Sequence, residues 1–209
     1  MEVHENRTYY YPSGCNDIFS CSLDSLYSFQ VYIGENRRIN LRDGDSAWYY
    51  TNDSVSMYGA TSRNSQVIFS NYVCTVIRGY TPPERTAQII STNLPYINGC
   101  STESLLPPIR LGDPTMQILY MPPHSSEQEE HIHSTVRVVY VLSGTGISIA
   151  CGKEQELNVG DVLILDKMVP RHFGTFDEPL VCSPFHVWSS TSAEFNHPMF
   201  NGTHLTNNK

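Results

Sequence analysis

The sequence predicts an all-β protein, and both its composition and its turns support this class. Tyr, Gly and Pro each occur 13 times in the 209-residue chain. Val, Ile and Thr recur in short runs along the chain, and such runs favour pleated strands. Turn-forming residues interrupt these runs at short intervals, as they do in antiparallel sheets.

The first half contains short candidate strands separated by turns. Residues 9–11 form the first candidate, and further candidates lie at residues 28–33, 46–50, 66–70 and 72–78. Glycine-containing turns separate them at residues 34–36, 43–45 and 58–59. We therefore expect residues 1–80 to form one β domain.

Residues 81–113 have a different composition, with five prolines and few periodic apolar residues. We expect a linker here, with one short helix near residues 84–91. A structureless segment of this length is unusual inside one compact domain. The sequence therefore predicts a second domain at residues 114–190, followed by a polar tail at residues 191–209.

Strand patterns resume after the predicted linker. The candidates are residues 115–121, 131–142, 146–151, 162–165 and 180–188. A weak internal repeat links the two halves, because Gly44-Asp45 and Gly160-Asp161 each open a strand. An aromatic-Gly pair closes the next turn in both halves. Either the chain contains a duplicated barrel, or two β-rich halves resemble each other by chance.

Two histidines begin the candidate strand at residues 131–142. Residues two apart on a strand point to the same face, so the imidazoles of His131 and His133 can reach one metal ion. A third histidine, His172, follows a later glycine turn, and a neighbouring strand could bring it to the same point. The first half has Met57 where the second has His172, so only the second half carries this set.

From His131 onward the sequence resembles the cupin superfamily. The first motif of that family reads here as His131-x-His133, then Arg137, and then a strand that ends at Gly144 and Gly146. The second motif reads as Gly160-Asp161, an apolar strand, and Pro170-Arg171-His172. The interval from Gly160 to His172 is one residue longer than the usual pattern, so another register for the third ligand stays open.

The resemblance implies a cupin-type antiparallel β-barrel or jelly roll, duplicated so that residues 1–80 form a degenerate copy without ligands. It implies that His131, His133 and His172 bind one divalent metal inside the second barrel. Similarity to the three-histidine thiol and diketone dioxygenases favours Fe(II), and imidazole ligands also suit Zn or Ni, with Mn as a further alternative.

Arg137 is the main departure from the family pattern, which has a glutamate at this position. A guanidinium cannot bind a metal and stays charged at any relevant pH. Together with a metal held by neutral imidazoles, Arg137 would attract an anionic ligand and hold it bidentately. The alternatives are that Arg137 pairs with Glu129, Glu130 or Asp161, that it extends into solvent, or that the site has lost its function.

Other side chains are weaker candidates. His186 is either a core histidine or an acid–base group of the site. His124 is expected in a loop. The acidic run Glu127, Glu129 and Glu130 is expected to be solvated, although one of its members could replace the missing carboxylate ligand. Cys151 and Cys182 are expected to be small core residues.

Three functions follow from these expectations. The first is a metal-dependent enzyme for a small anionic metabolite, with Fe(II)/O2 dioxygenation as the preferred reaction and Arg137 binding the substrate. The second is a non-redox isomerase, lyase or cyclase in which His186 moves a proton. The third is a cupin that binds a ligand without turnover. Fold alone does not choose among them.

Net charge and cysteine spacing limit the partners and the cellular location that the sequence predicts. The formal net charge is −8, and the 13 Lys and Arg residues form no basic stripe, which argues against nucleic acid. No run of about 18 apolar residues predicts a membrane span. The six cysteines form no Cys-x-x-Cys pair and the start of the chain lacks an apolar signal region, so we expect reduced thiols and a cytoplasmic location. The expected partner is a small-molecule substrate, and the resemblance is compatible with a homodimer.

Overall fold

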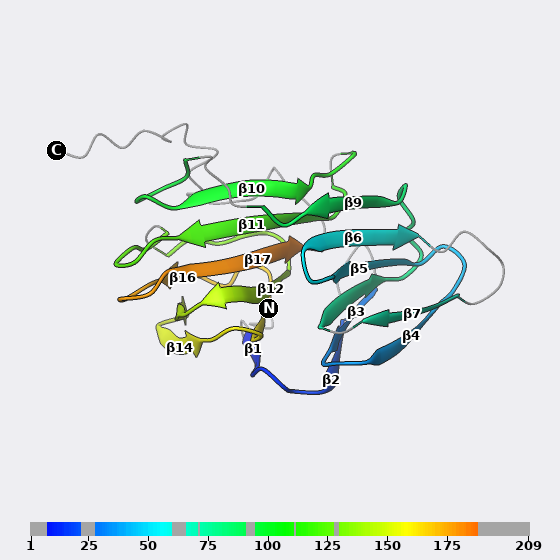
Figure 1. The fold of residues 1–209 in the computed structure, drawn as a ribbon, viewed down its shortest axis with the longest axis horizontal. Helices are drawn as coiled ribbons and strands as arrows, with labels where there is room; N and C mark the ends of the chain where they lie inside the picture. Colours follow the sequence, from blue (N-terminus) through cyan, green and yellow to red (C-terminus); the bar gives the residue numbers. More distant parts are fainter. Residues whose placement is uncertain are drawn as a thin grey trace, which may run out of the picture. The chain divides into compact units, whose positions relative to one another are not determined.

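The computed structural model describes residues 8–21, 28–59, 66–70, 72–90, 95–110, 112–127 and 130–187. These residues form seventeen strands and no helix, which confirms the all-β prediction (Figure 1). No helix within the described ranges has the length and apolar character needed to cross a membrane. Four strands have the predicted bounds: residues 46–50, 66–70, 115–121 and 162–165.

The chain divides into two compact units. The N-terminal unit comprises Tyr11–Ile90, and the C-terminal unit comprises Met1–Tyr10 together with Ser91–Lys209. The first strand therefore belongs mainly to the C-terminal unit, although it lies at the start of the chain. Each unit contains one six-stranded sheet and one smaller sheet, and antiparallel pairs occur in both units.

The N-terminal unit has a six-stranded sheet in the order β2-β3-β8-β5-β6-β9 and a two-stranded sheet of β4 and β7. Side chains from β4, β5 and β8 form a buried hydrophobic cluster of Ile39, Leu41, Ala47, Cys74 and Val76. The strand bounds are β2 Asp17–Cys21, β3 Phe29–Ile33, β4 Arg37–Leu41, β5 Ser46–Tyr50, β6 Ser54–Gly59, β7 Gln66–Ser70, β8 Val73–Ile77 and β9 Arg85–Gln88.

The C-terminal unit has a six-stranded sheet in the order β1-β15-β12-β17-β11-β10 and a three-stranded sheet in the order β14-β13-β16. In Figure 1, β10, β11, β17 and β12 lie side by side in that order. The bounds are β1 Thr8–Tyr11, β10 Ser101–Leu106, β11 Thr115–Met121, β12 Arg137–Gly144, β13 Gly146–Ala150, β14 Lys153–Leu157, β15 Val162–Leu165, β16 Arg171–Gly174 and β17 Leu180–His186.

Apolar side chains from both sheets of the C-terminal unit meet in one hydrophobic cluster. It includes Val139 and Val141 of β12 and Phe173 of β16. On β12 these two valines are fully buried, whereas Tyr140 between them is half-buried on the other face. By the period of two along a strand, Arg137 points to the same inner face as Val139.

The expectation of a short helix near residues 84–91 is wrong. The described residues 84–90 contain the strand β9 and no helix. β9 pairs antiparallel with β6, so that Arg85 lies opposite Met57 and Gln88 lies opposite Ser54. The hydroxyls of Ser56 and Thr86 also hydrogen-bond across this pair at 3.0 Å. Residues 81–113, for which the sequence predicts a linker, also contain β10, which pairs with β11.

The strand with the two histidines also begins later than predicted. β12 starts at Arg137, and His131 joins a sheet only through an isolated antiparallel bridge to Arg171. Residues 132–136 lie outside any strand. The face that each histidine presents is therefore set by this bridge and not by a continuous strand.

The Gly-Asp turns of the predicted repeat have the same geometry. The Asp45 carboxylate accepts a hydrogen bond from the Arg42 amide at 2.9 Å, and the Asp161 carboxylate accepts one from the Asn158 amide at 2.7 Å. A third such turn, at Asp113, lies outside the repeat. The preceding strands also differ, because β13 pairs with β14 whereas β3 and β4 lie in different sheets. The turn alone therefore does not establish a duplication.

Gly144 offers a test of the C-terminal sheet. Its φ is +75°, and an added Cβ would overlap the carbonyl oxygen of Pro179. We expect Gly144→Ala to destabilise the protein by more than about 2 kcal/mol, because backbone strain and steric overlap add. Gly152 is the matched control, since its φ is +71° but nothing lies within 4 Å of an added Cβ. Chemical denaturation should show a loss of only about 1 kcal/mol for Gly152→Ala. Equal losses for the two variants would contradict the packing described for β12 and β17.

Candidate functional site

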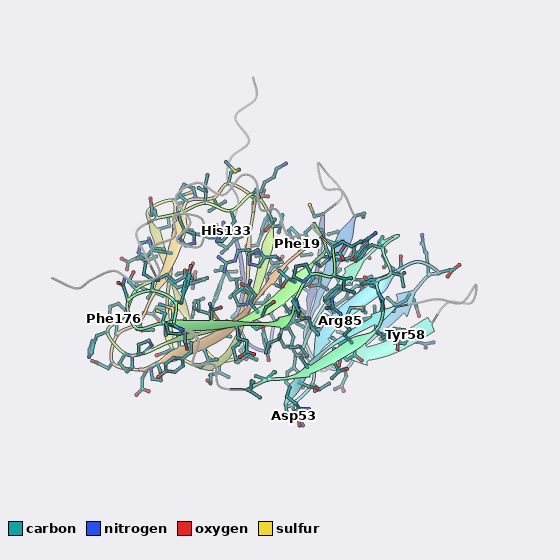
Figure 2. All side chains as sticks on the ribbon, turned by 90° about the horizontal axis from the view of Figure 1, so that it is seen from above. Phe19, Asp53, Tyr58, Arg85, His133 and Phe176 are labelled. Atoms are coloured by element: carbon teal, nitrogen blue, oxygen red, sulfur yellow. The ribbon has the colours of Figure 1, made fainter. Side chains whose placement is uncertain are left out.

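The C-terminal unit buries a cluster of basic side chains, which we call the basic cluster. Its members are His131 (2% exposed), His133 (3%), Arg137 (4%), Arg171 (1%) and His186 (7%). Figure 2 labels His133 among the side chains of this unit. Arginine is almost never fully buried unless its charge is compensated, so two buried guanidiniums in one cluster mark it as a functional candidate.

The bridge between His131 and Arg171 determines which residues face the cluster. The His131 amide donates to the Arg171 carbonyl at 3.1 Å, and the Arg171 amide donates to the His131 carbonyl at 3.0 Å. Directly opposed residues of an antiparallel pair point to the same face. The next residue, His172, therefore points to the opposite face of β16 from Arg171 and Phe173.

His131 and His133 lie close together. Their Nε2 atoms are 3.1 Å apart, and their ring centroids are 4.9 Å apart with the rings nearly perpendicular. Nη1 of Arg137 lies 2.9 Å from Nε2 of His133. Because a guanidinium can only donate, Nε2 of His133 is the acceptor, and the ring proton of His133 lies on Nδ1.

His186 packs on the other side of this group. Its ring lies edge-on to that of His133, with 5.4 Å between centroids, and Nδ1 of His186 lies 3.2 Å from the Thr135 hydroxyl. His186 is also the cross-strand partner of Arg137 in the β12–β17 pair. The structure thus brings the predicted candidates Arg137 and His186 together with His131 and His133.

The electrostatics of the cluster favour neutral imidazole. Burial lowers the pKa of His133 well below its usual value, and the charges of Arg137 and Arg171 lower it further. Nearby His186 and His131 act in the same direction. His133 is therefore uncharged at neutral pH, and the two arginines supply the positive charge of the cluster.

Glu127 is a buried acid beside these arginines. It is 2% exposed, its Oε2 accepts a hydrogen bond from the Phe173 amide at 3.3 Å, and its own amide donates to the Phe173 carbonyl. Burial raises the pKa of Glu127, while the charges of Arg137 and Arg171 oppose that rise. The prediction that this residue lies in a solvated loop is wrong.

The structure does not bring His172 to the other two histidines. His172 is partly exposed, pairs with Ile149 of β13 and lies on the opposite face from Arg171. Its Nδ1 is buried without a hydrogen-bond partner in the described structure. Arg171 takes the inner position. Sequence reasoning passed over Arg171, although the extra residue between Gly160 and His172 is the signal that could have found it.

The remaining candidates lie elsewhere. His124 occupies an exposed turn with φ +54°, 3.6 Å from Asp177. Cys182 is fully buried in the core, as predicted, but Cys151 is exposed in a turn because it connects β13 and β14. Glu130 is exposed, and Glu129 lies outside the described residues.

A divalent metal can be tested against this donor set. Zinc–imidazole bonds are about 2.0–2.1 Å long, so two ring nitrogens on one ion lie about 3 Å apart, and the His131–His133 pair fits that spacing. The neighbouring positions hold Arg137 and Arg171, and a guanidinium cannot coordinate a cation. Within the described ranges, no three His, Cys, Asp or Glu side chains are grouped as metal ligands would be. The described residues therefore do not fit a metal held by three protein ligands.

Comparison with known proteins identifies the fold. Residues 117–188 match the model of the Cupin domain family. No curated protein matches the sequence. Among solved structures, salicylate 1,2-dioxygenase from Pseudoaminobacter salicylatoxidans with gentisate has a TM-score of 0.56 at 8% identity, covering 87% of this chain and 81% of that one.

Two further structures are similar at a lower score. A Cupin 2 conserved barrel domain protein from Leptotrichia buccalis has a TM-score of 0.48 at 15% identity, covering 85% of this chain and 91% of that one. The polyketide cyclase RemF from Streptomyces resistomycificus has a TM-score of 0.42 at 17% identity, covering 46% and 70%. Residues 117–188 of the C-terminal unit are thus similar to the Cupin domain family, over less than half of the chain.

Proposed function

We propose that the C-terminal unit binds a small anionic molecule beside Arg137. The observation that carries this proposal is the environment of the Arg137 side chain. It is 4% exposed, it donates to His133, and its Nε is buried without a hydrogen-bond partner among the described residues. A buried guanidinium in this state gains most from an oxyanion that can accept its N–H groups.

The charges of the cluster favour the same kind of ligand. Arg137 and Arg171 contribute two positive charges, and Glu127 contributes at most one negative charge. The other buried acids of this unit are engaged elsewhere. Asp113 pairs with Arg110, and Asp161 accepts hydrogen bonds from the Asn158 amide and the Tyr10 hydroxyl. The basic cluster together with Glu127 therefore has a net positive charge whether or not Glu127 is ionised.

Extension of Arg137 into solvent and its pairing with Glu130 or Asp161 are not seen in the described part of the chain. Its burial excludes extension into solvent, and no described carboxylate lies within ion-pair distance of it. The solved structure of salicylate 1,2-dioxygenase contains gentisate, so this fold accommodates a small molecule. Ligand binding without a metal corresponds to the third function expected from the sequence. The homodimer and the cytoplasmic location stay predictions.

Metal-dependent dioxygenation is the second candidate function. The 3.1 Å separation of the His131 and His133 nitrogens favours it, because one ion could lie between them. Similarity to a dioxygenase fold also favours it. It requires donors besides these two imidazoles, and His172 lies on the other face of β16. Fe(II), Zn, Ni and Mn are the metals that this candidate would involve.

Anion binding can be tested by thermal shift and calorimetry. Acetate and propionate should raise the Tm of the protein, and acetamide and propionamide should not, because ligands that bind only the folded state stabilise it. Arg137→Gln should weaken carboxylate binding at least about tenfold, since a hydrogen bond to a charged group contributes about 1.5–3 kcal/mol.

Arg38→Gln is the matched control for this experiment. Arg38 is exposed on β4 and its replacement removes the same charge without touching the basic cluster. Equal loss of carboxylate affinity in both variants would mean that binding depends only on the net charge of the protein. An absence of any shift with the carboxylates would contradict the proposed function.

Elemental analysis of protein purified anaerobically separates the two candidates. We expect less than stoichiometric Fe, Zn, Ni or Mn, because among the described residues only the His131 and His133 nitrogens are shown at a spacing that fits one ion. His172→Ala should leave the metal content unchanged, since His172 lies away from the cluster. A full equivalent of metal that both His131→Ala and His172→Ala remove would instead support the three-histidine site and the dioxygenase candidate.

A further inference from the structure

Arg171 lies on the same face of the C-terminal unit as the two histidines. The bridge to His131 directs its side chain to the face that carries His131 and His133. The family pattern quoted above has a third histidine in this segment and a glutamate at position 137. This chain has arginine at both inner positions, so two cations replace one imidazole and one carboxylate around an otherwise intact histidine pair.

The two guanidiniums come from different strands of the unit, and both act on His133 electrostatically. Arg137 lies on β12 and contacts Nε2 of His133 directly. Arg171 lies on β16, is 1% exposed, and donates through Nη1 to the carbonyl of Val169 at 3.1 Å. The charge of Arg171 acts on both His133 and Glu127. One interior region thus lies within the field of both arginines.

We propose that Arg171 is a second ligand-binding residue, and that the two arginines hold a carboxylate in the region where the other two ligands of a metal site would lie. This inference rests on the proposed function, because it names the chemical class of the anion and a second residue that selects it. A guanidinium presents paired N–H groups that match the two oxygens of a carboxylate.

Charge balance favours a monoanionic carboxylate over a dianion such as phosphate. With Glu127 ionised the two arginines leave one positive charge, and with Glu127 protonated they leave two. A monoanion brings the buried cluster to neutrality when Glu127 is ionised, and it leaves one positive charge when Glu127 is protonated. A dianion would leave an uncompensated negative charge when Glu127 is ionised, which is costly in a buried site.

If the inference is correct, two substitutions together should change the site from one that binds a carboxylate to one that binds a divalent cation. Arg137→Glu combined with Arg171→His would add one imidazole and one carboxylate to the face that carries His131 and His133. Isothermal titration with Zn²⁺ should then show about one bound ion per chain for the double variant, and none for the wild type. Acetate binding should be lost in the double variant.

Two added substitutions test the geometry of the double variant. In that background His131→Ala should abolish Zn²⁺ binding, and His172→Ala should leave it unchanged because His172 faces away. Stoichiometric Zn²⁺ binding by the wild type that depends on His131 would overturn the inference. A double variant with the far-UV and near-UV circular dichroism of the wild type but no affinity for Zn²⁺ would also overturn it.

Single substitutions keep the inference testable if the double variant does not fold. Arg171→Gln should weaken acetate binding at least about tenfold, and Arg171→Lys should weaken it less because it keeps the charge and loses the fork. Acetate binding that Arg137→Gln weakens and Arg171→Gln leaves unchanged would overturn this inference alone. No acetate binding to the wild type would overturn the proposed function and this inference together.

Discussion

The pair of backbone hydrogen bonds between His131 and Arg171 is the constraint on which the candidate site depends. It joins the segment before β12 to β16 and thereby fixes which side chains of both segments face the interior. A shift of one residue in this pairing would reverse the faces and exchange Arg171 with His172. The chemistry of the cluster is therefore decided by a register, and the register is set by two hydrogen bonds and the adjoining pairing of β16 with β13.

Sequence patterns predicted much of the fold because local signals and tertiary pairing agree there. β5, β11 and β15 are short apolar runs bounded by turn residues, and their bounds follow from the pattern alone. β9 shows where this reasoning fails. The Pro82-Pro83-Glu84 sequence has the character of a helix start, but pairing with β6 and the Ser56–Thr86 contact give the segment an extended conformation. No local signal reports that a distant strand offers an unpaired edge.

The sequence also predicted part of the candidate site, as it predicted part of the fold. Arg137 was predicted beside the histidines, and the structure brings it together with His133, His131 and His186. The inward direction of Arg171 was missed, because the family motif points to His172. The extra residue between Gly160 and His172 was a signal for it, and the register of β16 decides between the two residues. Glu127 was also missed, since an acidic run next to a strand is usually solvated and its burial follows from pairing with Phe173.

Because β1 belongs to the sheet of the C-terminal unit, a truncated protein that starts after the N-terminal unit lacks one strand of that sheet. β1 forms the edge of the six-stranded sheet next to β15, and the Tyr10 hydroxyl donates to Asp161 at 2.9 Å. A shortened protein that begins at Ser91 would retain every member of the basic cluster but would leave the edge of β15 unpaired. Exposed edges of this kind promote association between chains. Anyone isolating the C-terminal unit should therefore keep residues 8–11 available to it, for example by supplying them as a separate peptide or by joining them to its start through a flexible connection.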